Sequence, residues 1–183
     1  MTDKTRNELL EEILAATGGQ AVDNLSGGIL DYNDATTAVT PISVTAAAGF
    51  VELTNDGAGP FTNKAYAPSA VTDVWDSSLN QFDFSQLKLG DMVDVRMELE
   101  VTTTSANQSV KVDLFLGTGA GAYQVPFIFA KPKTAGVHTL NRFNGFYMGD
   151  ANTLDNPAKF KIQSDANCTV VVVGWYCKIL VRG

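Results

Sequence analysis

His138 is the only histidine in the chain, and it limits the catalytic chemistry that the sequence can support. Cupin-type metal centres need several histidine ligands, so a single histidine excludes them. A histidine-activated serine would have to use His138, and the chain has no Gly-x-Ser-x-Gly nucleophile elbow. We interpret His138 as a polar residue on a strand and predict no catalytic residue.

Two loops contain residues that bind phosphate or metal in other proteins. The glycine-rich segment 117–121 resembles a phosphate loop in composition, but no predicted helix follows it to supply the N-terminal amides. Oxygen ligands gather at Asp150, Asn152, Asp155 and Asn156, but their spacing is not that of an EF-hand and no bidentate glutamate completes the set. We predict a hairpin loop and an Asx-rich turn, with no cofactor and no metal site.

Trp75 lies between Asp73 and Asp76, an arrangement that has two interpretations. Aromatic rings beside carboxylates bind sugars by stacking and hydrogen bonding, whereas most such tryptophans are core anchors with a polar indole handle. We favour the core anchor. The alternative is a host glycan or receptor site in which Trp75 and Tyr123, together with Tyr147, contact the ligand.

The charge of the chain argues against nucleic-acid binding. Its 183 residues include 13 Lys and Arg against 20 Asp and Glu, which gives a net charge of −7, and no basic run occurs. Phosphate backbones need clustered cations. The longest apolar run, Val170 to Cys177, is too short to span a membrane, and the N-terminus lacks the apolar region of a signal peptide. We expect a soluble protein that binds neither nucleic acid nor membrane.

The two cysteines, Cys168 and Cys177, are predicted to lie on one continuous strand. Nine steps of about 3.3 Å separate them by about 30 Å, too far for a disulfide. Their odd spacing predicts opposite faces of the strand. Both are therefore expected to be free thiols of a protein made in a reducing cytoplasm.

The N-terminal residues 1–19 have the pattern of a short amphipathic helix. Thr5 and Glu8 fit a capping box, and Gly18-Gly19 ends the helix. One apolar stripe is formed by Leu9, Leu10, Ile13 and Leu14. A helix this short is marginal alone in water, so the stripe must dock either on its own domain or on a partner. These four residues are the predicted partner anchor.

Residues 20–41 are rich in Gly, Asn, Asp and Thr and are predicted to form an extended arm. From residue 42 to residue 183 the pattern is that of strands, most clearly where Val93 to Val101 alternate with charged residues. A strand is also predicted over 137–148, interrupted at Asn144-Gly145, with shorter candidates at 42–44, 50–53, 71–75 and 82–84. The predicted fold is all-β, an antiparallel β-sandwich (jelly roll) with a short N-terminal α-helix and an extended arm.

The last predicted strand is apolar on both of its faces. One face is wholly apolar from Val171 to Val181, and the other is apolar over its first half. A strand with two apolar faces is buried on both. We interpret the second face as a subunit interface, with coverage by the arm or by a loop as the alternative. The predicted interface residues are Val170, Val172, Tyr176 and Leu180.

Three segments carry a resemblance to known families. Residues 87–96, Leu-Lys-Leu-Gly-Asp-Met-Val-Asp-Val-Arg, are similar to a strand entry of trimeric jelly-roll modules of the tumour-necrosis-factor-like kind, and residues 174–181 resemble their final strand. The opening Thr5 to Leu10, with Gly18-Gly19, is similar to the start of some tailed-phage virion proteins.

This resemblance implies a non-enzymatic homotrimer on a phage particle, made in the host cytoplasm and located in the virion. Its expected partners are further copies of itself and the major capsid or tail protein. The implied role is capsid decoration (cement) or head fibre, with a receptor- or glycan-binding tail fibre or tail tip as the alternative.

Overall fold

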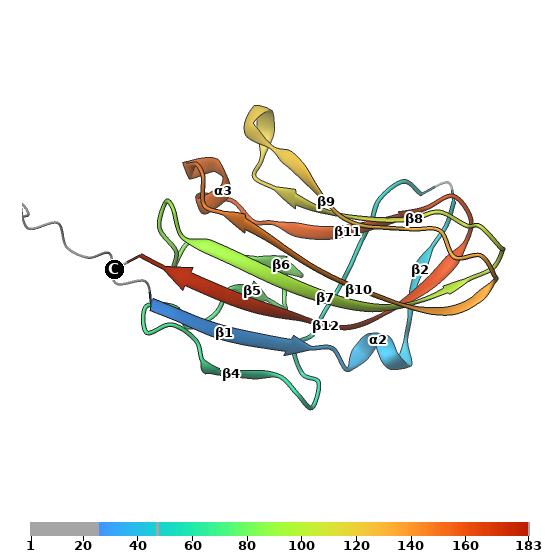
Figure 1. Ribbon diagram of the computed structural model, residues 1–183, viewed down its shortest axis with the longest axis horizontal. Helices are drawn as coiled ribbons and strands as arrows, with labels where there is room; N and C mark the ends of the chain where they lie inside the picture. The colour runs from blue at the N-terminus through green and yellow to red at the C-terminus, as the bar shows by residue number, and fades with distance from the viewer. Residues whose placement is uncertain (1–25, 47, 183) are drawn as a thin grey trace, which may run out of the picture.

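The computed structural model describes residues 26–46 and 48–182, and these form two antiparallel sheets packed face to face (Figure 1). The larger sheet has the strand order β10-β7-β12-β1-β4, with β2 pairing one end of β12. Its strands are β1 (Ser26–Asn33), β2 (Ile42–Val44), β4 (Asn63–Tyr66), β7 (Met92–Thr103), β10 (Gly136–Tyr147) and β12 (Cys168–Val181). The predicted all-β sandwich of jelly-roll type is confirmed.

The smaller sheet has the order β3-β11-β8-β9. Its strands are β3 (Val51–Glu52), β8 (Val110–Leu116), β9 (Tyr123–Ala130) and β11 (Lys159–Ser164). The remaining elements are the ribbon β5 (Trp75–Asp76) and β6 (Gln81–Phe82), the helices α2 (Thr36–Val39) and α3 (Ala151–Asp155), and the 3-10 turn η1 (Gly119–Gly121). No helix among the described residues is long and apolar enough to cross a membrane.

Alternating side chains fill the space between the sheets. On β7 the residues from Val93 to Val101 at every second position are buried, as the sequence pattern predicted. An aromatic cluster joins the two sheets around Phe160, whose ring centroid lies 4.8 Å from that of Phe127 and 5.3 Å from that of Trp175. The core is therefore continuous from β9 and β11 to β12.

The predicted arm is wrong for residues 26–41. Ser26 to Asn33 form β1, which pairs with β12 from Ser26 opposite Val181 to Asn33 opposite Gly174 (Figure 1). Leu30 and Tyr32 are fully buried. The period-two pattern was hidden because only two side chains of this glycine- and asparagine-rich segment enter the core. The predicted helix, with Leu9, Leu10, Ile13 and Leu14, lies outside the described residues.

The last strand contains a β-bulge that changes which side chains face inward. Its pairing with β7 shifts between Val172 and Gly174, so Val170 and Val172 are buried before the shift and Trp175 and Cys177 after it. A bulge adds one residue to one strand and so reverses the alternation beyond it. Gly174 fits this position because a Cβ there would lie 2.6 Å from the carbonyl oxygen of Tyr32 on β1.

Two strand predictions are also corrected. β10 runs without interruption through Asn144-Gly145, because Gly145 and Asp94 pair within a twelve-residue ladder between β10 and β7. The candidates over 71–75 and 82–84 shorten to the two-residue strands β5 and β6, which pair with each other, and Phe82 of β6 also bridges Ala158.

Candidate assembly surface

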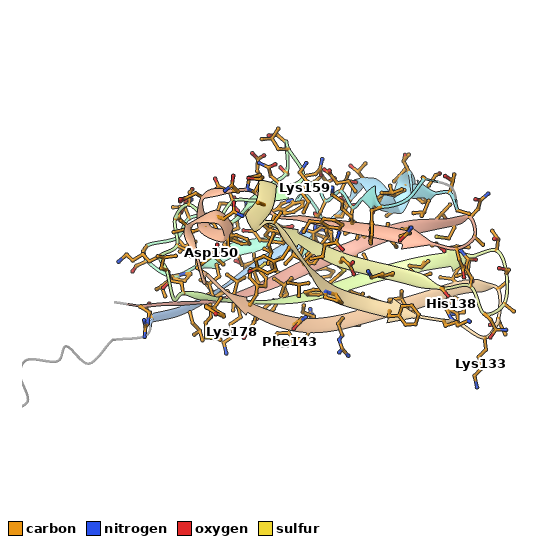
Figure 2. All side chains as sticks on the ribbon, turned by 90° about the horizontal axis from the view of Figure 1, so that it is seen from above. Lys133, His138, Phe143, Asp150, Lys159 and Lys178 are labelled. Atoms are coloured by element: carbon orange, nitrogen blue, oxygen red, sulfur yellow. The ribbon has the colours of Figure 1, made fainter. Side chains whose placement is uncertain are left out.

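The outer face of the larger sheet, which we call the outer sheet face, presents aligned rows of side chains away from the core. One row is apolar, since the register places Tyr147 beside Met92 and Met92 beside Leu180. Tyr147 is 62% exposed and Met92 is 44% exposed. Figure 2 shows Phe143 and Lys178 on this side of the molecule and Lys159, from the smaller sheet, on the other.

A second row of the outer sheet face mixes aromatic and charged groups. Phe143, Arg96, Tyr176 and Asp31 lie side by side on β10, β7, β12 and β1. The Arg96 guanidinium lies 5.3 Å from the centre of the Tyr176 ring, within cation–π range. Partial burial raises the pKa of Asp31, and the positive charge of Arg96 opposes that rise. The charged groups of this row, Arg96 and Asp31, could set the orientation of a bound partner.

The structure separates the four residues predicted for the interface. Val170 and Val172 are fully buried in the core of the same chain, so the prediction that they form a subunit contact is wrong. Tyr176 and Leu180 lie beyond the bulge, on the outer sheet face, and are partly exposed. Sequence reasoning missed Met92 and Phe143 and assigned Tyr147 to a ligand site instead of this face. The signal for all three was an apolar side chain among the polar positions of β7 and β10.

Trp75 is a core residue, which contradicts its role in the glycan alternative. Its side chain is 4% exposed, its indole Nε1 donates to the carbonyl oxygen of Asn55 at 2.8 Å, and its ring packs against Trp175. No ring face is left for a sugar. The open hollow of about 360 Å³ beside it is lined mainly by polar side chains, including those of Asp76 and Asp83.

Asp73 supports this core from the edge of the same hollow. Its carboxylate accepts a hydrogen bond from the Tyr32 hydroxyl at 2.6 Å and pairs with Lys64. Partial burial raises the pKa of Asp73, but the bonds from Lys64, Tyr32 and the Trp75 amide outweigh it and hold that pKa below its ordinary value. Burial is also the main reason that the pKa of Tyr32 is raised. These contacts tie β1 to the loop before β5.

The two loops considered for phosphate and metal pack against each other. Asn152 accepts a hydrogen bond from the Thr118 amide and donates one to the Thr118 carbonyl oxygen. Asp150 caps α3 by accepting from the Thr153 amide at 2.7 Å, which lowers the pKa of Asp150. Tyr123 is 42% exposed, and its hydroxyl lies 3.3 Å from that of Thr153. In the described part of the chain, no three His, Cys, Asp or Glu side chains are placed to hold a metal ion.

Both cysteines are free thiols, as predicted, and both are buried. The prediction that they lie on opposite faces is wrong, because the bulge at Gly174 lies between them and turns both toward the core. Burial raises the pKa of Cys177 and of Cys168. His138 lies on β10, and its Nε2 is 2.9 Å from the carbonyl oxygen of Thr134.

Comparisons with known proteins give neither a matching family model nor a matching curated protein. Among solved structures, the chain is similar to the structure of infectious bursal disease virus Gt strain, with a TM-score of 0.43 and 11% identity over 88% of this chain and 34% of that one. It therefore spans about a third of that chain's length.

The chain is also similar to a structure of a tumour necrosis factor and to one of a virus particle. The structure of Eiger TNF from S. frugiperda matches with a TM-score of 0.43 and 7% identity over 85% of this chain and 91% of that one. The naturally occurring empty particle of Cowpea mosaic virus matches with a TM-score of 0.27 and 10% identity over 90% of this chain and 85% of that one. At these scores the likenesses assign neither a family nor a function.

Proposed function

We propose that this protein is a non-enzymatic structural component of a virus particle that assembles as a homotrimer through its outer sheet face. The observation that carries the proposal is the apolar row of Tyr147, Met92 and Leu180, which a single copy leaves partly exposed to water. Apolar burial contributes about 25 cal/mol per Å² before the costs of ordering and association. If another copy covers this row in the trimer, burial of these side chains would stabilise the assembly by that free energy per Å².

The finer role that we propose is capsid decoration (cement) on a tailed phage, with the homotrimer bridging neighbouring subunits of the particle. This finer role rests on the resemblance of residues 5–10 to the start of some tailed-phage virion proteins. The N-terminal stripe of Leu9, Leu10, Ile13 and Leu14 is the proposed anchor on the major capsid protein. The burial of Trp75 removes one of the three aromatic side chains of the receptor-binding alternative, while Tyr123 and Tyr147 are exposed.

The assembly surface is tested by the solution mass of the full-length chain, measured by light scattering. We expect a mass of three times 19.5 kDa for the unchanged protein. The double variant Met92→Glu/Leu180→Glu places two carboxylates on the apolar row, so we expect a folded monomer.

Leu79→Glu is the matched control, because Leu79 is similarly exposed but lies on the β5–β6 turn, away from the outer sheet face. It should remain a trimer. A double variant that keeps both its melting transition and its trimeric mass would contradict the proposed interface.

The anchor is tested separately on particles. Replacing Leu10 and Ile13 with Asp removes half of the apolar stripe, so we expect a folded trimer that no longer sediments with particles lacking the protein. The described sandwich core is built from residues 30–181, so the circular dichroism spectrum of the strands should be unchanged. Sedimentation equal to that of the unchanged protein would exclude the stripe as the anchor.

A further inference from the structure

The two sheets leave an open groove between their edge strands β9 and β10. Residues 126–130 of β9 and 139–142 of β10 line a hollow of about 470 Å³. Within the described chain, β9 pairs only with β8 and β10 only with β7, so both strands have a free edge here. Phe127 and Ile128 belong to the core beneath it, Leu140 packs partly against the core, and Phe129 is 74% exposed. This β9–β10 groove is thus lined by apolar side chains together with the polar side chains of Thr139, Asn141 and Arg142.

The strands that line the groove carry basic residues, although Glu98 on the neighbouring β7 accepts a hydrogen bond from Asn141 of the lining at 3.4 Å. Residues 114–149 contain no Asp or Glu, whereas they include Lys131, Lys133 and Arg142. Arg142 lines the groove directly, and Lys133 lies in the loop between β9 and β10, at the same end of the molecule as His138 of β10 (Figure 2). None of the ion pairs found among the described residues involves these three cations. A partner with both apolar and acidic groups would complement this surface.

The N-terminal sequence of the same chain has that composition. Residues 1–25 include five acidic and two basic residues, and Glu8, Glu11 and Glu12 flank the stripe from Leu9 to Leu14. A twelve-residue helix over 6–17 would be about 18 Å long. The five residues of β9 in the groove span about 15 Å. We propose that this amphipathic segment of the chain covers the β9–β10 groove in the free protein, with its apolar stripe on Leu140 and Phe129 and its glutamates beside Arg142.

The connecting chain is long enough for this contact within one copy. β1 begins at Ser26 and lies three strands from β10, about 14 Å across the sheet. Arg142, at the near end of the groove, is five residues along β10 from Tyr147, about 17 Å. These displacements combine to about 22 Å, whereas the eight residues 18–25 reach about 28 Å when extended. Docking in the same copy also benefits from a high effective concentration.

Photo-cross-linking of the full-length free protein tests the proposal. A p-benzoylphenylalanine at position 10, irradiated and mapped by peptide mass spectrometry, should link to residues 126–142. A mixture of isotopically light and heavy protein reports whether each link joins one copy or two, and we expect links within one copy. Arg142→Glu should lower the yield of these links about fivefold or more by opposing the glutamates.

Two further variants make the result specific. Lys88→Glu removes an exposed cation from the loop before β7, outside the groove and the outer sheet face, and we expect it to leave the yield unchanged. Combining Arg142→Glu with Glu11→Lys and Glu12→Lys should restore the links. Links that map elsewhere, links found only between copies, or a yield insensitive to Arg142→Glu would each overturn the proposal. Because this assay contains no particle, its outcome is independent of the particle-binding test of the proposed function.

Discussion

Replacing Phe160 with alanine is expected to lower the free energy of unfolding by about 3–5 kcal/mol. Phe160 is fully buried on β11, and its ring contacts those of Phe127 on β9, Phe82 on β6 and Trp175 on β12. Truncation removes the transfer free energy of the ring and leaves a cavity between the sheets that rigid strands cannot fill. Urea unfolding followed by tryptophan fluorescence measures the change.

Phe61→Ala is the control for this prediction, because it removes the same ring from a site that is 77% exposed. We expect a change within about 0.5 kcal/mol. A loss below about 1 kcal/mol for Phe160→Ala would mean that the two sheets close over the missing ring, and that the core between them is less rigid than the packing indicates.

Replacing Lys111 with methionine is expected to lower the free energy of unfolding by about 3 kcal/mol. Asp113 on β8 is fully buried, and apart from Lys111 its carboxylate oxygens have no hydrogen-bond partner among the described residues. The Lys111 ammonium lies 2.6 Å from Asp113 Oδ2 and supplies the compensating charge, while its own side chain is 40% exposed. Without it, a buried carboxylate remains uncompensated.

The double variant Lys111→Met/Asp113→Val separates the ion pair from general packing. A buried pair replaced by apolar groups is often neutral, so we expect this variant to recover most of the lost stability. Lys178→Met, on the opposite sheet, should be neutral. Equal losses for the single and double variants would show that Lys111 acts through its aliphatic stem rather than through its charge.

Much of the sandwich could be predicted from the sequence, because period-two alternation is a local property. The alternation from Val93 to Val101 identified β7 and its buried face without reference to any other strand. Where few side chains enter the core, as in β1, the same rule failed: Leu30 and Tyr32 alone did not distinguish a central strand from an arm. Trp75 was correctly favoured as a core anchor because an indole offers both a large apolar surface and one donor to satisfy.

The sequence by itself determined the fold class, the free thiols and the acidic character of the chain, because these follow from composition and local periodicity. The tertiary structure decided which side chains of the last strand face outward. Pairing with β7 and close contact with β1 require a bulge at Gly174, and that extra residue moved Val170 and Val172 into the core while leaving Tyr176 and Leu180 outside. The candidate surfaces likewise exist only after folding, because β10, β7 and β12 come from distant parts of the chain and meet through their backbone hydrogen bonds.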